Sequence, residues 1–299
     1  MSTNSLTKLQ QREEKFPKGK EEFPKGREFP KGREFPKGRT SLDVPLWLVI
    51  LFGVQFGPIA RLCAADPGNL SVLLQRADHL DDTDHFLEAI AILKEAEKGD
   101  PKDVEILYRI SRVESDLVDD LSDEARKKPY ATDSLAYAKR ATEADPQNSE
   151  AHLAAAIAYG VMTDFVDDRT KMEYSKVIKS EAEKAIELDP KNDYAYLVLA
   201  RWNFEMTQLN PFLKGIAEIL YGQMPPASQE RALEDFQKAI ELAPDKMIHH
   251  FCYGEALAKL GRKDQAKAEY QKVLRLTATC REERGYQQKA TSGLRTLER

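Results

Sequence analysis

The eight-residue phrase Glu-Lys-Ala-Ile-Glu-Leu-Asp-Pro at 183–190 returns almost unchanged at 237–244, as Gln-Lys-Ala-Ile-Glu-Leu-Ala-Pro. Weaker copies end at Pro101 and Pro146. A recurring phrase of this kind indicates a repeat of paired helices, and one such unit cannot bury its apolar face alone, so it must stack on its neighbours. The sequence therefore predicts an all-α solenoid of helical hairpins, in which function lies in a groove rather than in a catalytic pocket.

Small residues stand at fixed distances before the four anchoring prolines. Five places before each Pro is an alanine: Ala96, Ala141, Ala185 and Ala239. Twelve places before the Pro stand Ala89 and Ala232 in two repeats, whereas the middle repeats depart from this with Ser134 and Ile178. The last unit carries Tyr253-Gly254, Ala266 and Tyr270 at the spacings of a further copy. This pattern resembles the 34-residue tetratricopeptide repeat, whose alanines pack against the partner helix. In that last unit, Gly261 is expected to end the first helix in the left-handed conformation.

The anchoring prolines lie 45, 44 and 54 residues apart, so the units exceed 34 residues and must carry insertions. The largest insertion follows Asn210-Pro211, which reads as an N-cap with proline at the first helical position. Apolar residues then share one face as far as Gly222, and Pro225-Pro226 prevents continuation. The sequence predicts an extra helix over 211–221 within the fourth repeat, which either covers part of the superhelix or docks a partner or membrane.

The sequence also resembles the regulator of microtubule dynamics family over roughly 75–299. The resemblance is carried by Ala200-Arg201-Trp202, by the inserted segment ending at Pro225, by 232–239 and by the terminal Leu294-Arg295-Thr296-Leu297. It implies a non-enzymatic helical module, some of whose relatives associate with microtubules or sit at organelle membranes. It does not supply an established set of binding residues.

The first 43 residues differ in composition from the repeats. Residues 1–40 carry 11 Lys or Arg against 6 Glu, and a Phe-Pro-Lys-Gly hexapeptide recurs through 16–39. Each hexapeptide holds Pro, Gly and a single large apolar side chain, which is too little for a packed core. We expect 1–43 to be a disordered basic head, either a tract that touches anionic lipid or acidic protein, or a recently duplicated, non-essential extension.

A hydrophobic segment follows the head. The fifteen residues 46–60 are short for a membrane span, which needs about 20, but match a signal-peptide core. Cys63-Ala64-Ala65 supplies small residues before Asp66. We therefore predict that 44–65 is a signal peptide or membrane anchor and that 66–299 is the solenoid domain. The protein is then exported (periplasmic or extracytoplasmic) or membrane-anchored, or cytoplasmic if the segment is not a working signal.

The chain offers little chemistry. It has no nucleophile elbow, phosphate-cradling loop, Cys-x-x-Cys or His-Glu-x-x-His, so we expect neither an enzyme nor a cofactor. His79 and His85 lie among aspartates without EF-hand spacing, so no metal is expected. We expect His249-His250 to start a helix on a solvated rim. The sequence does not decide whether Cys252 and Cys280 form a disulfide. The acidic solenoid argues against nucleic acid.

A protein partner is therefore the expected ligand. In a tetratricopeptide superhelix the first helix of each unit lines the concave surface, and this register selects Tyr108, Arg112, Tyr194, Leu197, Arg201 and Phe251. Aromatic, aliphatic and arginine side chains are typical of peptide anchors. The alternative is that the inserted helix covers several of these six residues. We expect an interaction scaffold of the regulator of microtubule dynamics type; the alternative is an exported assembly protein of a bacterial envelope, unrelated to microtubules.

Overall fold

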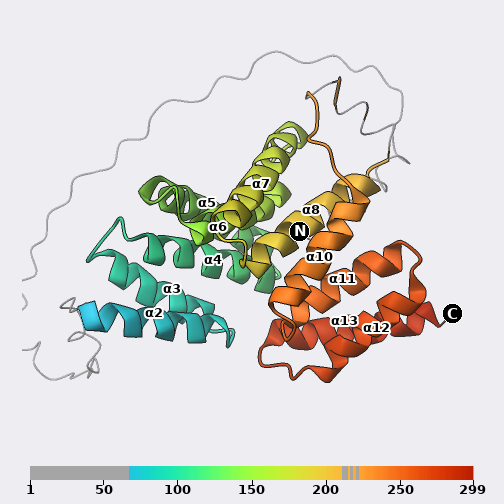
Figure 1. The fold of residues 1–299 in the computed structure, drawn as a ribbon. Coiled ribbons are helices and arrows are strands. Elements are labelled where there is room, and N and C mark those ends of the chain that lie inside the picture. The colour runs from blue at the N-terminus through green and yellow to red at the C-terminus, as the bar shows by residue number, and fades with distance from the viewer. Residues whose placement is uncertain (1–66, 211–214, 216–217, 220–221, 299) are drawn as a thin grey trace, which may run out of the picture. The chain divides into compact units, whose positions relative to one another are not determined.

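A computed structural model describes residues 67–210, 215, 218–219 and 222–298 (Figure 1). The basic head (1–43), the hydrophobic segment (44–65) and most of the helix predicted over 211–221 lie outside the described residues. Within the insertion, residues 215, 218 and 219 are helical, and Gly222 follows with φ of 90°. The boundary at residue 66 stays a prediction.

The described part of the chain contains α-helices and one short 3-10 turn, without a strand. The helices are α2 (Pro67–Asp81), α3 (Phe86–Glu97), α4 (Val104–Asp120), α5 (Glu124–Ala144), α6 (Ser149–Met162), α7 (Asp168–Leu188), α8 (Asp193–Gln208), α10 (Gln229–Leu242), α11 (Met247–Lys259), α12 (Lys263–Arg275) and α13 (Arg281–Leu297). The 3-10 turn spans Thr163–Phe165. The all-α class predicted from the repeats is confirmed.

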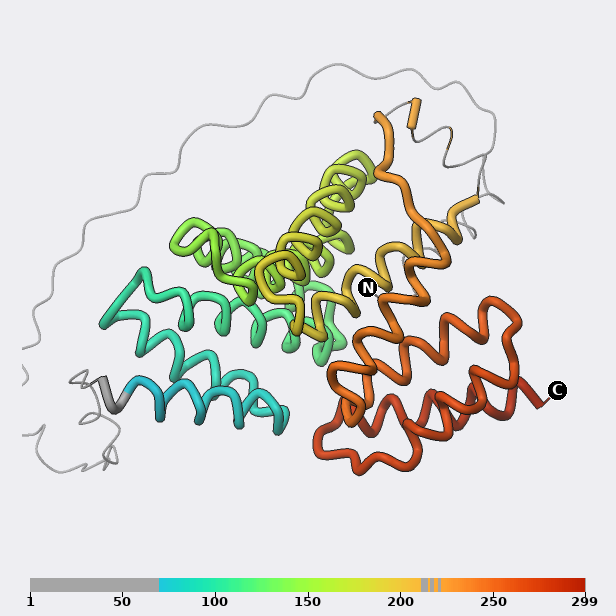
Figure 2. Tube along the Cα trace, viewed as in Figure 1, coloured from blue at the N-terminus to red at the C-terminus, as the bar shows by residue number. Residues whose placement is uncertain are grey.

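The helices pack as five consecutive hairpins, α2/α3, α4/α5, α6/α7, α8/α10 and α11/α12, and α13 packs on the last of them. The first helices of successive hairpins contact one another, α2 with α4, α4 with α6, α6 with α8 and α8 with α11. We call these five first helices the inner layer, and α3, α5, α7, α10 and α12 the second layer. Figure 2 traces this succession from blue to red.

Local sequence signals explain where the inner helices begin. Two residues after three of the anchoring prolines stands an Asp or Asn whose side chain caps the next helix. Asp103 accepts from the backbone N–H of Glu105 at 2.8 Å, Asn148 from Ala151 at 3.0 Å and Asn192 from Ala195 at 3.1 Å. The proline therefore ends one hairpin, and the capping residue starts the next.

The alanine register is visible in the packing. Ala141, Ala185 and Ala239 are fully buried, and Ala96 is partly buried. Ser134 stands at an alanine position and is also fully buried, because its hydroxyl lies 2.8 Å from Ser115 Oγ and donates to the carbonyl of Ser111 at 2.9 Å. A polar side chain is tolerated there because its hydrogen bonds are made within the core.

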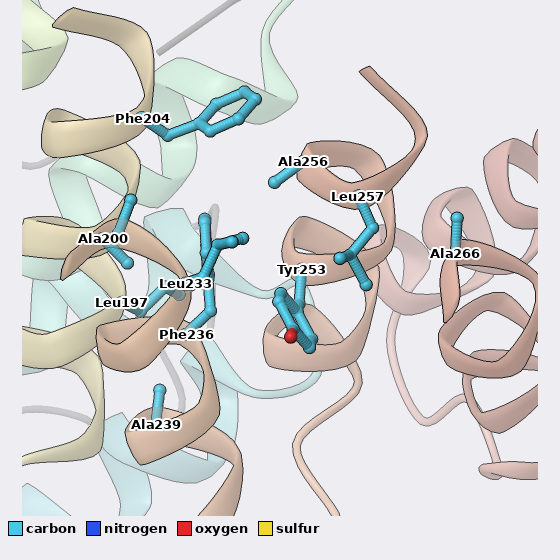
Figure 3. Packing of buried hydrophobic residues seen from close by; sticks show 11 residues of the cluster. Leu197, Ala200, Phe204, Leu233, Phe236, Ala239, Tyr253, Ala256, Leu257 and Ala266 are labelled. Atoms are coloured by element: carbon cyan, nitrogen blue, oxygen red, sulfur yellow. The ribbon is translucent and has the colours of Figure 1, made fainter. Parts of the chain in front are cut away.

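Side chains of α8, α10 and α11 form the apolar core that joins the fourth hairpin to the fifth (Figure 3). Phe236 on α10 stacks near Tyr253 on α11, with ring centroids 5.8 Å apart. Trp202 is 2% exposed, and its indole N–H donates to Ser175 Oγ on α7 at 2.9 Å. Buried contacts therefore join the third hairpin to the fourth and the fourth to the fifth.

The additional length of the middle units lies partly in their second helices. Both α5 and α7 have 21 residues, against 14 in α10 and 13 in α12. The helix expected to end at Gly261 does so with φ of 71° at that glycine. The insertions therefore extend hairpins without changing how consecutive units stack.

Candidate interaction face on the inner layer

Two of the six predicted partner-binding residues meet on the inner layer. The guanidinium carbon of Arg112, on α4, lies 6.0 Å from the ring centroid of Tyr194, on α8. Lys246, just before α11, places its Nζ 4.0 Å from the same ring. Both arrangements are within the range of a cation–π contact. Tyr194 is half-buried and the Arg112 side chain is 35% exposed, so this cluster is reachable from solvent.

Polar contacts hold the cluster in place across four hairpins. Arg112 Nη1 lies 3.5 Å from Glu150 Oε2 on α6, and the Asn192 amide donates to Glu150 Oε1 at 2.9 Å. Asp193 Oδ2 lies 2.9 Å from Lys246 Nζ and 2.7 Å from His249 Nε2. These bonds fix the side chains around Tyr194 before any partner arrives, which lowers the entropy cost of binding.

Carboxylates surround Arg112 at one end of the cluster. Desolvation by the surrounding helices raises the pKa of Asp81 to about 7 and raises the pKa of Asp116 well above its usual value, although Arg112 opposes both shifts. Desolvation alone would lower the pKa of Arg112, but the charges of Asp116 and Glu150 outweigh it and raise that pKa. The guanidinium therefore lies among carboxyl groups, and two of them, Asp81 and Asp116, have raised pKa values.

Another predicted residue, Phe251, lies against the C-terminal helix, and Arg201 is partly buried. The ring of Phe251 stacks on that of Tyr286 of α13, with centroids 4.9 Å apart, and Phe251 is only 4% exposed. Burial would lower the pKa of Arg201, but Cys252 and Tyr286 act on it and the pKa is raised. The helix α13 therefore covers the part of the inner layer that contains Phe251.

Tyr108 and Leu197 are core residues. Tyr108 is 5% exposed, packs with Ala141 and Ala151, and donates its hydroxyl proton to Glu105. Leu197 is 2% exposed and belongs to the core between α8, α10 and α11. These two positions of the first helix face the neighbouring helices rather than an open surface. Whether the six predicted residues contact a partner stays a prediction.

The histidine pair at 249–250 is not on a solvated rim, as the sequence suggested: His249 is 0% and His250 4% exposed. His250 Nδ1 lies 2.6 Å from Glu269 Oε2, and its Nε2 lies 2.8 Å from the carbonyl oxygen of Pro244. The carboxylate and the carbonyl are both oxygen acceptors, so a protonated ring nitrogen can donate to either of them. The ring is buried because it joins α11 to α12 and to the preceding turn.

The same bridge occurs in the third hairpin. His152 Nδ1 lies 2.5 Å from Glu181 Oε2, and its Nε2 lies 3.0 Å from the carbonyl oxygen of Pro146. Both histidines stand six residues after an anchoring proline. That shared offset was the available sequence signal, and it was missed.

The sequence analysis also missed α13 as a separate helix. Its partly or fully buried residues on the last hairpin are Tyr286, Ala290, Leu294 and Leu297. These positions follow one another at helical spacing, so the periodicity indicated a helix. What it did not indicate was that this helix would lie on α11 and contact the turn between α2 and α3.

The described residues offer no group of three His, Cys, Asp or Glu side chains arranged to hold a metal ion. Cys252 and Cys280 are both free thiols. Among the helices of the described residues, none is long and apolar enough to cross a membrane. The larger surface depression described, of about 310 Å³, is lined by residues of α10, α11 and α12 and by the turns beside them, and contains none of the six predicted residues.

Paired helices stacked through their first members define a tetratricopeptide-like solenoid. The fold is similar to that of a thermophilic tetratricopeptide protein of Thermus thermophilus, with a TM-score of 0.56 and 17% identity over 75% of this chain and 98% of that one. The profile of the regulator of microtubule dynamics protein 1-3 family matches residues 73–298. The chain belongs to that family.

Individual relatives share modest identity with this chain. Regulator of microtubule dynamics protein 2 of Mus musculus is 27% identical over 66% of this chain and 48% of its own length. Protein 3 of Xenopus laevis is 30% identical over 62% of this chain and 41% of its own. Protein 1 of Mus musculus is 29% identical over 58% of this chain and 56% of its own. The matched region therefore spans about half the length of these relatives.

Proposed function

We propose that this chain is a non-catalytic scaffold that holds a protein partner on the inner layer of its helices. The observation that carries the proposal is the cluster of Arg112, Tyr194 and Lys246, which is held by contacts from four hairpins and is open to solvent. Tyrosine and arginine are among the side chains that most often dominate binding energy at protein interfaces. The guanidinium can meet a partner carboxylate through two parallel hydrogen bonds.

The partner class we propose first is the microtubule, or a protein that acts on microtubules. The support is family membership, because the relatives are named regulators of microtubule dynamics. The chain spans only about half of those relatives, so this part of the proposal concerns the shared helical domain.

Co-sedimentation with polymerised tubulin tests the proposal. The full chain should pellet with microtubules, and the double variant Arg112→Ala/Tyr194→Ala should lose about 2 kcal/mol or more of binding energy while melting close to the parent. The matched control is Tyr137→Ala/Arg140→Ala, another tyrosine–arginine pair, whose guanidinium carbon lies 4.9 Å from the tyrosine ring centroid, on α5 of the second layer. Equal loss in both double variants would mean that the inner layer is not the binding face.

We also propose that residues 44–65 direct export or anchor the chain in a membrane. The support is sequence alone: fifteen mostly apolar residues followed by Cys63-Ala64-Ala65. N-terminal sequencing of the protein from its native host should find a start near Asp66, or the full chain should pellet with membranes. A freely soluble protein with its N-terminus intact would contradict both versions.

A further inference from the structure

The helix α13 packs on both helices of the last hairpin, α11 and α12, and few of its side chains are fully buried. Of its 17 residues, Tyr286 and Ala290 are buried, and they pack against Phe251, Met247 and Val273 of the last hairpin. The remaining side chains of α13 are partly or fully exposed. An element with so few buried contacts is expected to open locally, without unfolding of the whole domain.

The start of α13 faces residues from distant hairpins. The backbone N–H of Arg281 donates to Asp84 Oδ2 at 2.6 Å, in the turn between α2 and α3, and its guanidinium pairs with Asp120 at the end of α4. Arg284 Nη2 lies 3.8 Å from Asp84 Oδ2. We call these three contacts the clasp. Because Arg281 and Arg284 are 60% and 55% exposed, solvent screens their ion pairs and each adds little stability.

The sequence of α13 weakens it further. Gly285 and Gly293 both lie inside the helix, and glycine is among the poorest residues for a helix interior. A Cβ at Gly293 would meet the Tyr270 ring at 2.6 Å, so close packing against that ring requires glycine at position 293. A Cβ at Gly285 would meet nothing within 4 Å. Packing therefore does not require glycine at 285, and its main effect is to lower the stability of α13.

Resting on the proposed function, we propose that α13 is an intramolecular competitor of the partner. It covers the part of the inner layer that contains Phe251, and a partner binds by displacing it with an amphipathic helix of its own. Tyr286 seated on Phe251 shows what such a helix must carry, an aromatic side chain on a mostly polar helix. With α13 displaced, Phe251 would join Arg112 and Tyr194 on one open face. This is the helix-in-groove mode of recognition.

The probe for this proposal is a fluorescent peptide of residues 279–298, added to the full chain, with binding followed by anisotropy. Arg281→Ala/Arg284→Ala removes the two ion pairs of the clasp but keeps the backbone hydrogen bond of residue 281. This variant should bind the peptide about threefold more tightly, since a larger fraction of the chain is then open. Gly285→Ala strengthens α13 in its place and should weaken peptide binding about fivefold. Arg169→Ala, which removes an exposed ion pair on α7, is the matched control and should leave binding unchanged.

Two further readouts complete the test. A peptide carrying Tyr286→Ala should fail to bind any of the chains, and amide hydrogen exchange in α13 should be faster than in α12 and slower after Gly285→Ala. If the double arginine variant does not fold, the peptide affinity of Gly285→Ala, compared with that of the parent, decides whether the proposal holds. Equal peptide affinity for parent and Gly285→Ala, or no peptide binding at all, would overturn the proposal. Microtubule binding that still depends on Arg112 and Tyr194 would then leave the scaffold proposal standing.

Discussion

The ring of Tyr270 lies where a side chain at Gly254 would have to stand. A Cβ added at Gly254 would meet Cδ1 and Cε1 of that ring at 2.9 Å, and Cβ of Glu269 at 3.4 Å. The helices α11 and α12 approach each other closely because this position has no side chain. We expect Gly254→Ala to force them apart and to lower the free energy of unfolding by about 1–3 kcal/mol, measured by urea denaturation.

Gly160 in α6 is the matched control for that experiment. It is also a helix-interior glycine, but a Cβ there would meet nothing within 4 Å. Gly160→Ala should therefore be neutral, or should stabilise the protein by up to about 1 kcal/mol through the better helix propensity of alanine. If both substitutions destabilise equally, the contact between Tyr270 and Gly254 does not set the helix separation.

The alanine register gives a second prediction. Ala239 is fully buried between α10 and its neighbours, so Ala239→Leu should overpack the core and cost about 1–3 kcal/mol. Ala136 in α5 is solvent-exposed, and the same exchange there should change stability by less than about 0.5 kcal/mol. Comparison of thermal melting of the two variants checks this. Identical melting temperatures for Ala239→Leu and the parent would mean that the register is wrong.

The bridge between His250 and Glu269 predicts how stability changes with pH. Burial would raise the pKa of Glu269, but hydrogen bonds from His250 and Lys272 outweigh it and lower that pKa below its ordinary value of 4.5. A carboxylate whose pKa is lower in the folded state contributes stability above its unfolded pKa and loses it as the pH falls through the folded value. Glu269→Gln should therefore cost about 1–3 kcal/mol at pH 7, and this difference should shrink at a pH well below 4.5.

Urea denaturation of parent and variant across this pH range measures the difference. Glu241→Gln is the control, because the Glu241 side chain is 66% exposed and pairs only with Lys238 on the same helix among the contacts described. Its effect should be close to zero at every pH. A Glu269→Gln cost that is the same at pH 7 and in acid would show that packing, and not charge, accounts for it.

Trp202 should be required for stable folding. It is 2% exposed, and its indole N–H donates to Ser175 on the preceding hairpin. Trp202→Ala should cost about 3–5 kcal/mol because it leaves a cavity. Trp202→Phe keeps an aromatic ring and should lower the free energy of unfolding by less. Its cost should come chiefly from the lost hydrogen bond and from the smaller side chain. Chemical denaturation of both variants should show this order, and a reversed order would contradict it.

The sequence was sufficient to predict the hairpins because their signals are local. Each anchoring proline lies just after a helix, three of them are followed by a capping Asp or Asn, and the alanines five residues earlier mark the buried side of the second helix. All of these interactions act within a few residues or between adjacent helices. A repeat pattern records them directly, so the fold class and register could be read without coordinates.

The candidate site was harder to predict, because it depends on contacts between distant residues. The register placed Arg112 and Tyr194 on the inner layer, and they do meet, but it gave no sign that Lys246 would join them. Phe251 was expected to be open, whereas α13 covers it. That cover depends on where a terminal helix docks, which no local pattern specifies. The His250 bridge differs, because its offset of six residues from Pro244 was a local signal, and only its partner Glu269 on α12 was not.

The clasp has a consequence for how this protein can change in length. In an open stack each hairpin contacts only its neighbours, so units can be gained or lost at an end. Here Arg281 bonds to Asp84 across 197 positions of sequence. One more or one fewer hairpin between them would separate these atoms by the width of a unit. A stack with another number of hairpins would therefore lose the clasp, and we expect length variants that keep it to differ in loops and in long second helices such as α5 and α7.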